Sequence, residues 1–468
     1  MGATLFDKIW SQHRVFEDEG GKTLLYIDRV VVDDVRAPQV LKNLNRRALA
    51  IRRADLAVVV QDHSVPSFQT HTSLGGSVFV DATREAARNY GLRLLDVGDA
   101  EQGISHVTLP ALGLVLPGSI YLCVDSHSPT VGGVGAIGLA CGSTELEHVL
   151  ATQTMWLRKP RQMRLTFEGT LGSGVYAKDL ILHLIGRLGI EIARGVALEL
   201  TGSLIASLSI EARLTLCNMA VELGARTCIV APDEVTFAWL ATLPHVPRGE
   251  MWRSAYAHWQ ELRSDCDANF DIDLKIDCAD LEPQITWGTS PAQVTSIAGS
   301  VPATAALAGL DEAIWQRALG YMDLRPGARL AGTKVDRVFI GSCTNARLED
   351  IKRAALIAVG RKVASHVKAV VVPGSCAVSR KAQGQGLRDI LVDAGFFWGE
   401  PGCSMCAGGG GEKVVAGERI VSTTNRNFEN RQGAGVRTHL ASPATAAAAA
   451  IMGEICDPRP LMRGMEDV

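Results

Sequence analysis

The sequence predicts an α/β fold built on mostly parallel sheets. Short apolar runs recur along the chain, and each is followed by Gly, Ser, Asp or His and then by a helical pattern, as parallel sheets require. The clearest runs cover residues 56–60, 120–124, 338–340 and 370–372. Ligands bind to such sheets beyond the carboxyl ends of the strands. The polar residues that follow these runs are therefore expected to share one functional face.

Two helices can be placed in the last third of the chain. Residues 346–363 have an amphipathic pattern, and Thr344 or Asn345 is expected to be the N-cap. Ser442 and Pro443 precede a run of alanines that reaches Ala450. This pattern predicts a capped helix with proline in its first position rather than a low-complexity linker.

A length of 468 residues predicts two or three domains. Acidic sequence gives way to Ser/Thr/Gly/Pro-rich sequence between residues 283 and 302. We therefore expect an N-terminal α/β region over 1–285, made of two closely packed subdomains, and a C-terminal α/β domain over 286–468. The histidine motifs precede this boundary and the main cysteine motifs follow it, so a site that uses both would form in the cleft between domains.

The composition gives no electrostatic reason to expect a nucleic-acid or anionic-membrane partner, because the net charge is -3 and the sequence pI is about 6.4. No apolar run approaches the ~20 residues of a membrane helix, and the N-terminus lacks the apolar segment of a signal peptide. The eleven cysteines are therefore expected to be reduced or metal-bound in the cytoplasm.

Three cysteines are the strongest chemical signal. Cys403 and Cys406 form a Cys-x-x-Cys pair, which alone fits zinc, a redox dithiol, an iron–sulfur cluster or a structural role equally well. Cys343, in a Gly-Ser-Cys-Thr-Asn segment, favours the cluster. Zinc would need a fourth ligand, for which Cys376 is the nearest candidate. Three thiolates would leave one iron of a 4Fe–4S cluster open to substrate oxygens.

Histidines with carboxylate neighbours form a second signal. Asp62 and His63, His106, and Asp125 with His127 each follow a strand-like segment. A single histidine of this kind is more often an ordinary loop residue. Several together predict an Asp–His network suited to proton transfer, because an aspartate fixes the tautomer of its histidine.

The Ser-Cys-Thr-Asn345 and Cys403-x-x-Cys406 motifs, with Asn425-Arg-Asn-Phe428, resemble the aconitase superfamily. Almost the whole chain is similar to its isopropylmalate dehydratase large-subunit branch, particularly residues 151–153 and 285–291. The resemblance implies aconitase-like α/β/α domains, with one 4Fe–4S cluster per chain in the interdomain cleft. It assigns Cys343, Cys403 and Cys406 as the cluster ligands.

The resemblance also assigns roles to polar residues. Those expected to act in catalysis are Asp62, His63, His106, Asp125, Ser126, His127 and Glu222. Those expected to bind substrate are Asn218, Asn425, Arg426 and Arg431. From the residues alone, Asn218 and Glu222 could equally be an exposed i,i+4 pair, and the arginines could form surface salt bridges. As functional groups, the arginines suit the recognition of a di- or tricarboxylate.

The activity implied is that of a hydro-lyase, most closely the 3-isopropylmalate dehydratase of leucine biosynthesis. Alternatives are a related dehydratase of a smaller diacid (citramalate, maleate or dimethylmalate), an aconitate-type enzyme, a zinc-dependent lyase, or a binding protein that has lost turnover. The length fits a large subunit without the swivelling domain that carries the family's serine base. A separate small subunit is therefore expected, in a heterodimer or heterotetramer.

Some residues depart from the pattern of that branch. Val131 replaces a second histidine, Gly133 is closer to aconitase itself, and Asn430 stands where the family has glycine. Residues 407–410 also replace the usual sequence after the last cysteine. These differences suggest a paralogue that acts on a related hydroxy-diacid rather than a loss of hydratase chemistry.

Overall fold

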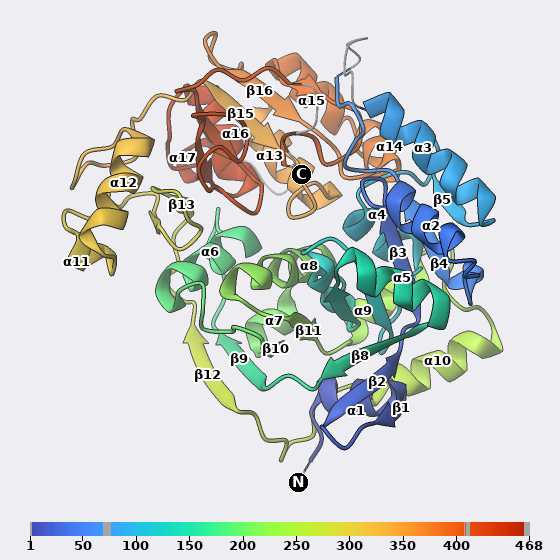
Figure 1. The fold of residues 1–468 in the computed structure, drawn as a ribbon. Helices are drawn as coiled ribbons and strands as arrows, with labels where there is room; N and C mark the ends of the chain where they lie inside the picture. Colours follow the sequence, from blue (N-terminus) through green and yellow to red (C-terminus); the bar gives the residue numbers. More distant parts are fainter. Residues whose placement is uncertain (1, 69–75, 407, 409–411, 463–468) are drawn as a thin grey trace. The chain divides into compact units, whose positions relative to one another are not determined.

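The computed structural model describes residues 2–68, 76–406, 408 and 412–462 (Figure 1). Contacts divide the chain into two compact units. Unit 1 comprises Met1–Ser64, Leu74–Thr170 and Glu191–Cys278, and unit 2 comprises Val65–Ser73, Leu171–Ile190 and Ala279–Val468. Unit 2 therefore includes two segments from the N-terminal half. The domain boundary between 285 and 286 stays a prediction.

Unit 1 contains two parallel sheets and one small antiparallel sheet. The first parallel sheet has the order β5 (Arg93–Leu95), β4 (Ala57–Val60), β3 (Arg29–Asp33), β6 (Ile120–Cys123) and β7 (Ile137–Ala140). The second has the order β11 (Thr227–Val230), β10 (Ala197–Thr201), β9 (Gln162–Glu168) and β12 (Ile272–Asp277). The antiparallel sheet has the order β1 (Arg14–Glu17), β2 (Lys22–Tyr26) and β8 (Thr154–Arg158).

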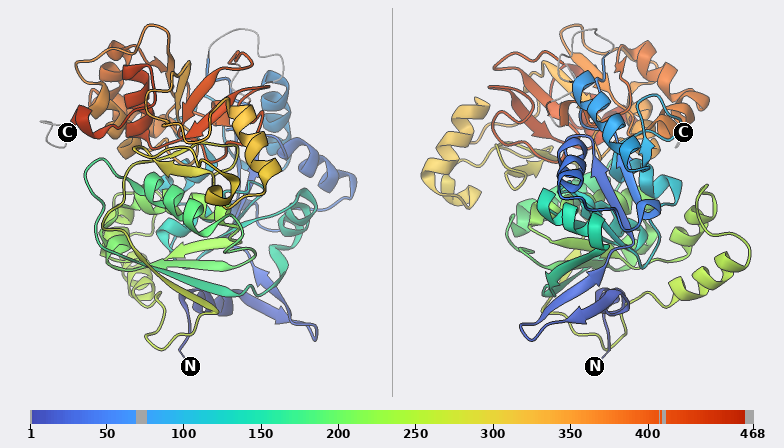
Figure 2. Two further views of the ribbon diagram at one scale, coloured as in Figure 1. Left: turned by 90° about the vertical axis from the view of Figure 1, so that its left-hand side faces the viewer. Right: turned by 45° about the vertical axis from the view of Figure 1, so that its right-hand side comes forward.

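The helices of unit 1 are α1 (Leu5–His13), α2 (Ala37–Arg46), α3 (Gly76–Asn89), α4 (Ser105–Leu112), α5 (Ser143–Thr152), α7 (Ser203–Ser207), α8 (Ile210–Met219), α9 (Glu234–Ala241) and α10 (Glu250–Gln260). Its short 3₁₀ segments are η1 (Ala54–Leu56), η2 (Ser128–Val134) and η3 (Ala220–Leu223). Helix α2 packs beside α3 and α5, as Figure 2 shows. None of the helices in the described ranges is long and apolar enough to span a membrane.

Unit 2 contains a parallel sheet in the order β17 (Phe397–Trp398), β16 (Lys368–Val371), β15 (Arg337–Ile340), β18 (Arg419–Ser422) and β19 (Arg437–Leu440). A hairpin joins β13 (Gln284–Thr286) to β14 (Val294–Ser296). Its helices are α6 (Ala177–Leu188), α11 (Ala305–Ala308), α12 (Glu312–Met322), α13 (Leu348–Ala358), α14 (Cys376–Gly384), α15 (Leu387–Ala394), α16 (Pro443–Met452) and α17 (Arg459–Met462), with the 3₁₀ segment η4 (Ser404–Cys406).

The four apolar runs form the predicted strands β4, β6, β15 and β16. In each parallel sheet, helices occur between strands along the chain. The first sheet of unit 1 is buried on both faces. Val30 and Val32 of β3 join one apolar cluster, whereas Val31 joins another. Alternate side chains of a strand point to opposite faces, so a strand covered on both faces needs an unbroken apolar run. The α/β prediction with mostly parallel strands is confirmed.

The two predicted helices fared differently. Helix α16 begins at Pro443 after the N-cap Ser442, as expected. The helix expected over 346–363 is shorter, because α13 spans only Leu348–Ala358. The Asp350 carboxylate accepts the backbone N–H of Arg347 (3.0 Å), so Arg347 is the cap rather than Thr344 or Asn345. Just beyond its end, Gly360 adopts a left-handed φ of 70°.

Two glycines allow η2 to lie directly against its neighbours. A Cβ atom on Gly132 would lie 1.7 Å from the carbonyl oxygen of Cys228 in β11, and one on Gly133 would lie 2.6 Å from the backbone nitrogen of Leu214 in α8. Any side chain would force these backbones apart. Gly133 is therefore a packing requirement, and Val131 beside it is fully buried in an apolar cluster.

Candidate active site

The carboxyl ends of three adjacent parallel strands in unit 1 carry a row of aspartates. Strand β3 lies between β4 and β6. Asp34 follows β3, Asp62 follows β4 and Asp125 follows β6. Because parallel strands all end at the same edge of a sheet, residues far apart in sequence meet there. The predicted gathering of polar residues at this edge is what the fold of unit 1 produces.

His63 lies between two of these carboxylates. Its Nδ1 is 2.6 Å from Asp62 Oδ1, and its Nε2 is 3.3 Å from Asp125 Oδ2. Burial disfavours the charged ring, but the two carboxylates outweigh it and raise the pKa of His63 well above its usual value. The side chain remains 20% exposed. His63 is thus a partly exposed ring between two carboxylates that favour its charged form.

Asp125 connects the histidines to one another. Its Oδ1 accepts hydrogen bonds from His106 Nε2 (3.0 Å) and from the backbone N–H of His127 (2.6 Å). Burial alone would raise the pKa of this carboxyl, but hydrogen bonds from His106, His127 and His63 hold it well below the usual range. Asp125 is thus the ionised centre of the network.

His106 reaches the network from a helix. It lies in the first turn of α4, well beyond the end of β5, and not in the loop that directly follows a strand. The start of that helix is fixed by Asp62, whose Oδ2 accepts the backbone N–H of Ser105 (2.9 Å). The other ring nitrogen of His106 lies 3.3 Å from the hydroxyl of Tyr121.

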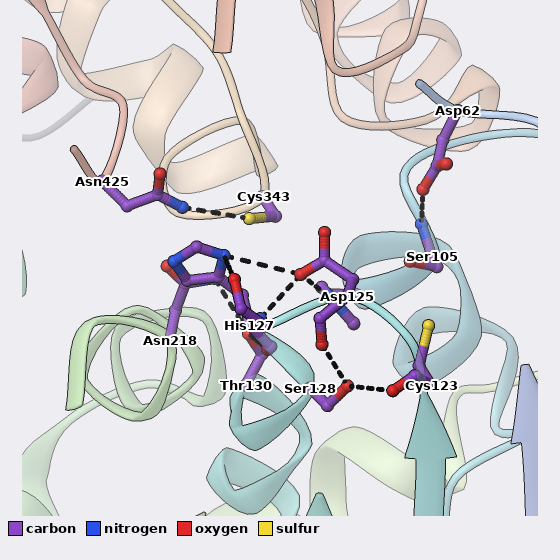
Figure 3. A network of polar contacts seen from close by, with 12 residues as sticks. Asp62, Ser105, Cys123, Asp125, His127, Ser128, Thr130, Asn218, Cys343 and Asn425 are labelled. Carbon is purple, nitrogen blue, oxygen red and sulfur yellow. Dashed lines mark hydrogen bonds and ion pairs between the residues drawn. The ribbon is translucent and has the colours of Figure 1, made fainter. Parts of the chain in front are cut away.

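Asn218 and Glu222 extend this region from α8 and η3. His127 Nε2 lies 3.1 Å from Glu222 Oε1, and Ser126 Oγ lies 3.3 Å from His127 Nδ1. Asn218 is fully buried and donates through Nδ2 to Thr130 Oγ1 (2.8 Å), as Figure 3 shows. Asn218 can reach Thr130 because η2 lies directly against α8. The alternative of an exposed i,i+4 pair is therefore wrong.

Three contributors to this region were not predicted. Asp34 accepts the backbone N–H groups of His63 (3.2 Å) and Ser64 (2.7 Å), and burial, reinforced by Asp62, raises its pKa. Tyr121 and Thr130 contact His106 and Asn218 as described. Asp34 could have been found, because it follows an apolar run just as Asp62 and Asp125 do. Tyr121 and Thr130 carry no such signal.

Unit 2 holds the three cysteines, and all of them are buried. Cys343 follows β15, whereas Cys406 closes η4. The Asn425 side chain lies between two of them: Nδ2 donates to Cys343 Sγ (3.5 Å), and Oδ1 lies 3.6 Å from Cys406 Sγ (Figure 3 shows the Cys343 contact). Cys343 and Cys406, from two separate motifs, therefore both lie next to Asn425.

The cysteine loops fit an iron–sulfur cluster. Ser342 and Ser404, each next to a cysteine, have left-handed φ angles of 80° and 50°. Such conformations cost about 1–3 kcal/mol each for residues other than glycine and occur mainly at ligand sites. Ser404 Oγ is buried without a hydrogen-bond partner in the described parts of the chain. An unmatched hydroxyl beside converging thiols suits hydrogen bonding to the sulfur of a cluster.

The backbone of the Cys343 loop is held by Arg347. This buried guanidinium donates to the carbonyl oxygens of Cys343 and Thr344, both at 2.9 Å. Asn345 donates through Nδ2 to Asp350 Oδ1 (2.8 Å), at the start of α13. The shape of the loop is thus fixed by contacts to its main chain and does not depend on the Cys343 side chain.

The predicted substrate arginines lie just after β18. Arg426 follows Asn425 directly and is half-buried. The guanidinium of Arg431, also half-buried, lies 5.4 Å from the ring centroid of Phe428, a cation–π contact. Asn430 between them adopts a φ of 67°, which explains a position where the family has glycine, because asparagine tolerates this conformation best after glycine. Residues 407, 409 and 410, part of another predicted departure, lie outside the described residues.

Residues 7–453 match the sequence profile of the aconitase family (aconitate hydratase). The chain belongs to the aconitase family. It is also 49% identical over 465 residues to 3-isopropylmalate dehydratase large subunit 1 of Bradyrhizobium diazoefficiens, a match that covers 99% of this chain and 98% of that protein. The crystal structure of Thermococcus kodakaraensis aconitase X in its holo form aligns with a TM-score of 0.46 at 11% identity, covering 94% of this chain and 90% of that one.

Membership of the aconitase family confirms the predicted resemblance and the predicted enzyme class, a hydro-lyase. Proteins of this family bind a 4Fe–4S cluster, and the three buried cysteines of unit 2, two of which contact Asn425, are consistent with that property. The individual site residues remain predictions.

Proposed function

We propose that this chain is the large subunit of an isopropylmalate dehydratase, which interconverts 2- and 3-isopropylmalate in leucine biosynthesis by removing and re-adding water. The observation that carries this proposal is the identity of 49% to such a subunit over 99% of the chain. The departures at Val131, Gly133 and Asn430 do not favour another diacid, because each has a local structural reason.

Cys343, Cys403 and Cys406 would hold one 4Fe–4S cluster per chain. The side chain of Asn425, which lies between Cys343 and Cys406, and the left-handed serines next to the cysteines support this assignment. When bound, such a cluster supplies a Lewis acid that polarises the hydroxyl and carboxylate of the substrate. A structural zinc site would need a fourth protein ligand, whereas a catalytic zinc takes three and keeps one position open. Metal analysis therefore separates the cluster from zinc.

The Asp–His network would supply the proton that converts the departing hydroxyl into water. His63 is suited to this role because Asp62 and Asp125 flank its ring and raise its pKa, and because its side chain is partly exposed. Asp125 would connect His63 to His106, which can then restore the proton. Dehydration and rehydration need the same proton to move in opposite directions, and a network with several linked histidines can do both.

The remaining assigned residues would bind and orient the diacid. Arg426 and Arg431 would hold a carboxylate, because the guanidinium fork matches its two oxygens. Glu222, with its contact to His127, would position the hydroxyl or water, with Ser126 beside it. Asn218 and Asn425 would act as hydrogen-bond donors close to the substrate and the cluster.

The name of the Bradyrhizobium relative, a large subunit, supports a second subunit as partner. We propose that a small subunit carries the swivelling domain and the base that removes the C–H proton, in a cytoplasmic heterodimer or heterotetramer.

The test is to purify the chain anaerobically and to assay conversion of 2-isopropylmalate to 3-isopropylmalate with and without the cognate small subunit. Turnover should require both chains. Robust turnover by this chain alone would show that the base lies within it, and failure with a loaded cluster and both chains would refute the substrate assignment.

A further inference from the structure

A fully buried lysine in unit 2 lies outside the set of residues assigned above. Lys178 is the second residue of α6, and its Nζ donates to the carbonyl oxygens of Thr423 (3.0 Å) and Thr424 (2.6 Å). Lysine is almost never fully buried without a specific partner. The start of α6 is itself fixed by Asp179, whose carboxylate accepts the backbone N–H groups of Tyr176 (2.9 Å) and Gln284 (2.8 Å). Lys178 therefore projects from a rigid helix end.

The two carbonyl oxygens belong to the segment that presents the anion-binding residues. Thr423 and Thr424 follow β18 and immediately precede Asn425 and Arg426. The carbonyl of Thr424 is part of the peptide unit that enters Asn425. Because one nitrogen binds two consecutive carbonyls, it fixes two consecutive peptide planes and hence the direction in which Asn425 leaves the strand.

The same point also joins the Cys343 loop. Thr423 Oγ1 accepts the backbone N–H of Gly341 and donates to its carbonyl oxygen, both at 2.9 Å. Ser342 Oγ lies 3.4 Å from the Thr423 carbonyl to which Lys178 also donates. Lys178 thus stabilises the junction between the loop that carries Cys343 and the loop that carries Asn425.

We propose that Lys178 is a positioning residue for the reaction: it orients the Thr423–Thr424 backbone so that Asn425 and Arg426 face the substrate. This inference rests on the proposed function, in which Arg426 binds a substrate carboxylate. Without the two donors, two buried carbonyls would lose their partners, and the loop would relax toward other donors. A misplacement of about 1 Å in substrate-positioning groups can cost about a hundredfold in rate.

The experiment compares Lys178→Met with a matched control, Lys362→Met, in the enzyme reconstituted with cluster and small subunit. Methionine has a side chain of similar length to the aliphatic part of lysine, but it lacks the ammonium group that donates the hydrogen bonds. Lys362 also donates to a backbone carbonyl, that of Asp393, but at an exposed position of unit 2. For Lys178→Met, kcat/KM for 2-isopropylmalate should fall by about tenfold to a hundredfold, with a raised KM. Iron and sulfide content should stay at the wild-type level, and the control should behave as wild type.

Hydrogen exchange on the large chain alone gives a readout that needs no substrate. In Lys178→Met, amides of residues 425–428 should exchange faster, whereas those of β15 and α16 should be unchanged; a general loss of stability would accelerate all of them. Wild-type kcat/KM together with unchanged exchange would overturn the inference. If the wild-type large chain with its small subunit does not turn over 2-isopropylmalate, the substrate assignment is wrong. The exchange result still tests the role of Lys178 in that case.

If Lys178→Met does not fold, Lys178→Arg takes its place. Arginine keeps the donors but is larger, so in this fully buried site it must displace the Thr423–Thr424 backbone. The KM for 2-isopropylmalate should then rise at least about threefold, with faster exchange confined to residues 425–428. A wild-type KM with wild-type exchange in the folded arginine variant would refute the positioning role.

Discussion

The Asp–His network of unit 1 and the cysteine loops of unit 2 are held in place by different interactions. In unit 1, charged side chains hold one another, with His63 between Asp62 and Asp125. In unit 2, buried cations hold the backbone: Arg347 binds the carbonyls of the Cys343 loop, and Lys178 those that precede Asn425. A charge network redistributes protons when one member is lost, whereas a loop held by its main chain keeps its shape when a side chain changes. Substitutions should therefore have coupled effects in unit 1 and separable effects in unit 2.

The largest effect is expected at a cluster ligand. Cys343→Ser should abolish the cluster and all turnover, because two thiolates cannot hold the cluster that three hold. Since Arg347 holds this loop through its carbonyls, the fold of unit 2 should persist, as measured by hydrogen exchange in β15 and α13. Cys376→Ser, in α14 of the same unit, is the control and should keep both cluster and activity. A brown, active Cys343→Ser protein would contradict the assignment.

In unit 1, Asp125→Asn should lower kcat by about 10²–10⁴, the range for loss of acid–base catalysis, with a normal cluster content. Because the network acts as one unit, the double variant Asp125→Asn/His63→Asn should be little worse than either single variant. The test is to measure kcat with 2-isopropylmalate for the two single variants and the double variant. Additive losses would mean that the two residues act independently.

The arginines should give a smaller loss. Arg426→Lys and Arg431→Lys keep the charge but lose the bidentate fork, so kcat/KM should fall at least about tenfold, which is about 1.4 kcal/mol. This is less than the roughly 2–5 kcal/mol typical of losing a charged partner altogether. Iron and sulfide content should be unchanged. Near-wild-type kcat/KM in both lysine variants would show that neither arginine binds the substrate carboxylate.

The smallest effect is expected at a charge pair of unit 1 that lies outside the Asp–His network. His13 Nε2 lies 2.7 Å from Asp28 Oδ2; burial opposes the charge, but Asp28 raises the pKa of His13 above 6.5. A raised folded pKa means that the pair stabilises fully at pH below 6.5 and that this stabilisation is lost as pH rises through the folded value. His13→Gln should thus cost up to about 1 kcal/mol at low pH and little at high pH, as measured by denaturant unfolding. A cost independent of pH would indicate packing instead.

The sequence predicted the parts of this molecule that depend on local pattern. The apolar runs gave the strands, and the residues after them gave Asp62 and Asp125. Contacts that depend on how distant segments pack, rather than on where strands end, were not predictable. Asn218 is buried because Gly132 and Gly133 let two backbones touch, and nothing near Asn218 signals this. Lys178 is 245 residues from the carbonyl of Thr423, and its helix pattern alone gives no reason to bury it.

The most direct test of the central claim is the iron, sulfide and zinc content of the chain purified anaerobically. The account predicts a brown protein with about four iron and four sulfide per chain, and loss of both when Cys343, Cys403 or Cys406 is replaced. A colourless protein that carries one zinc per chain would contradict it.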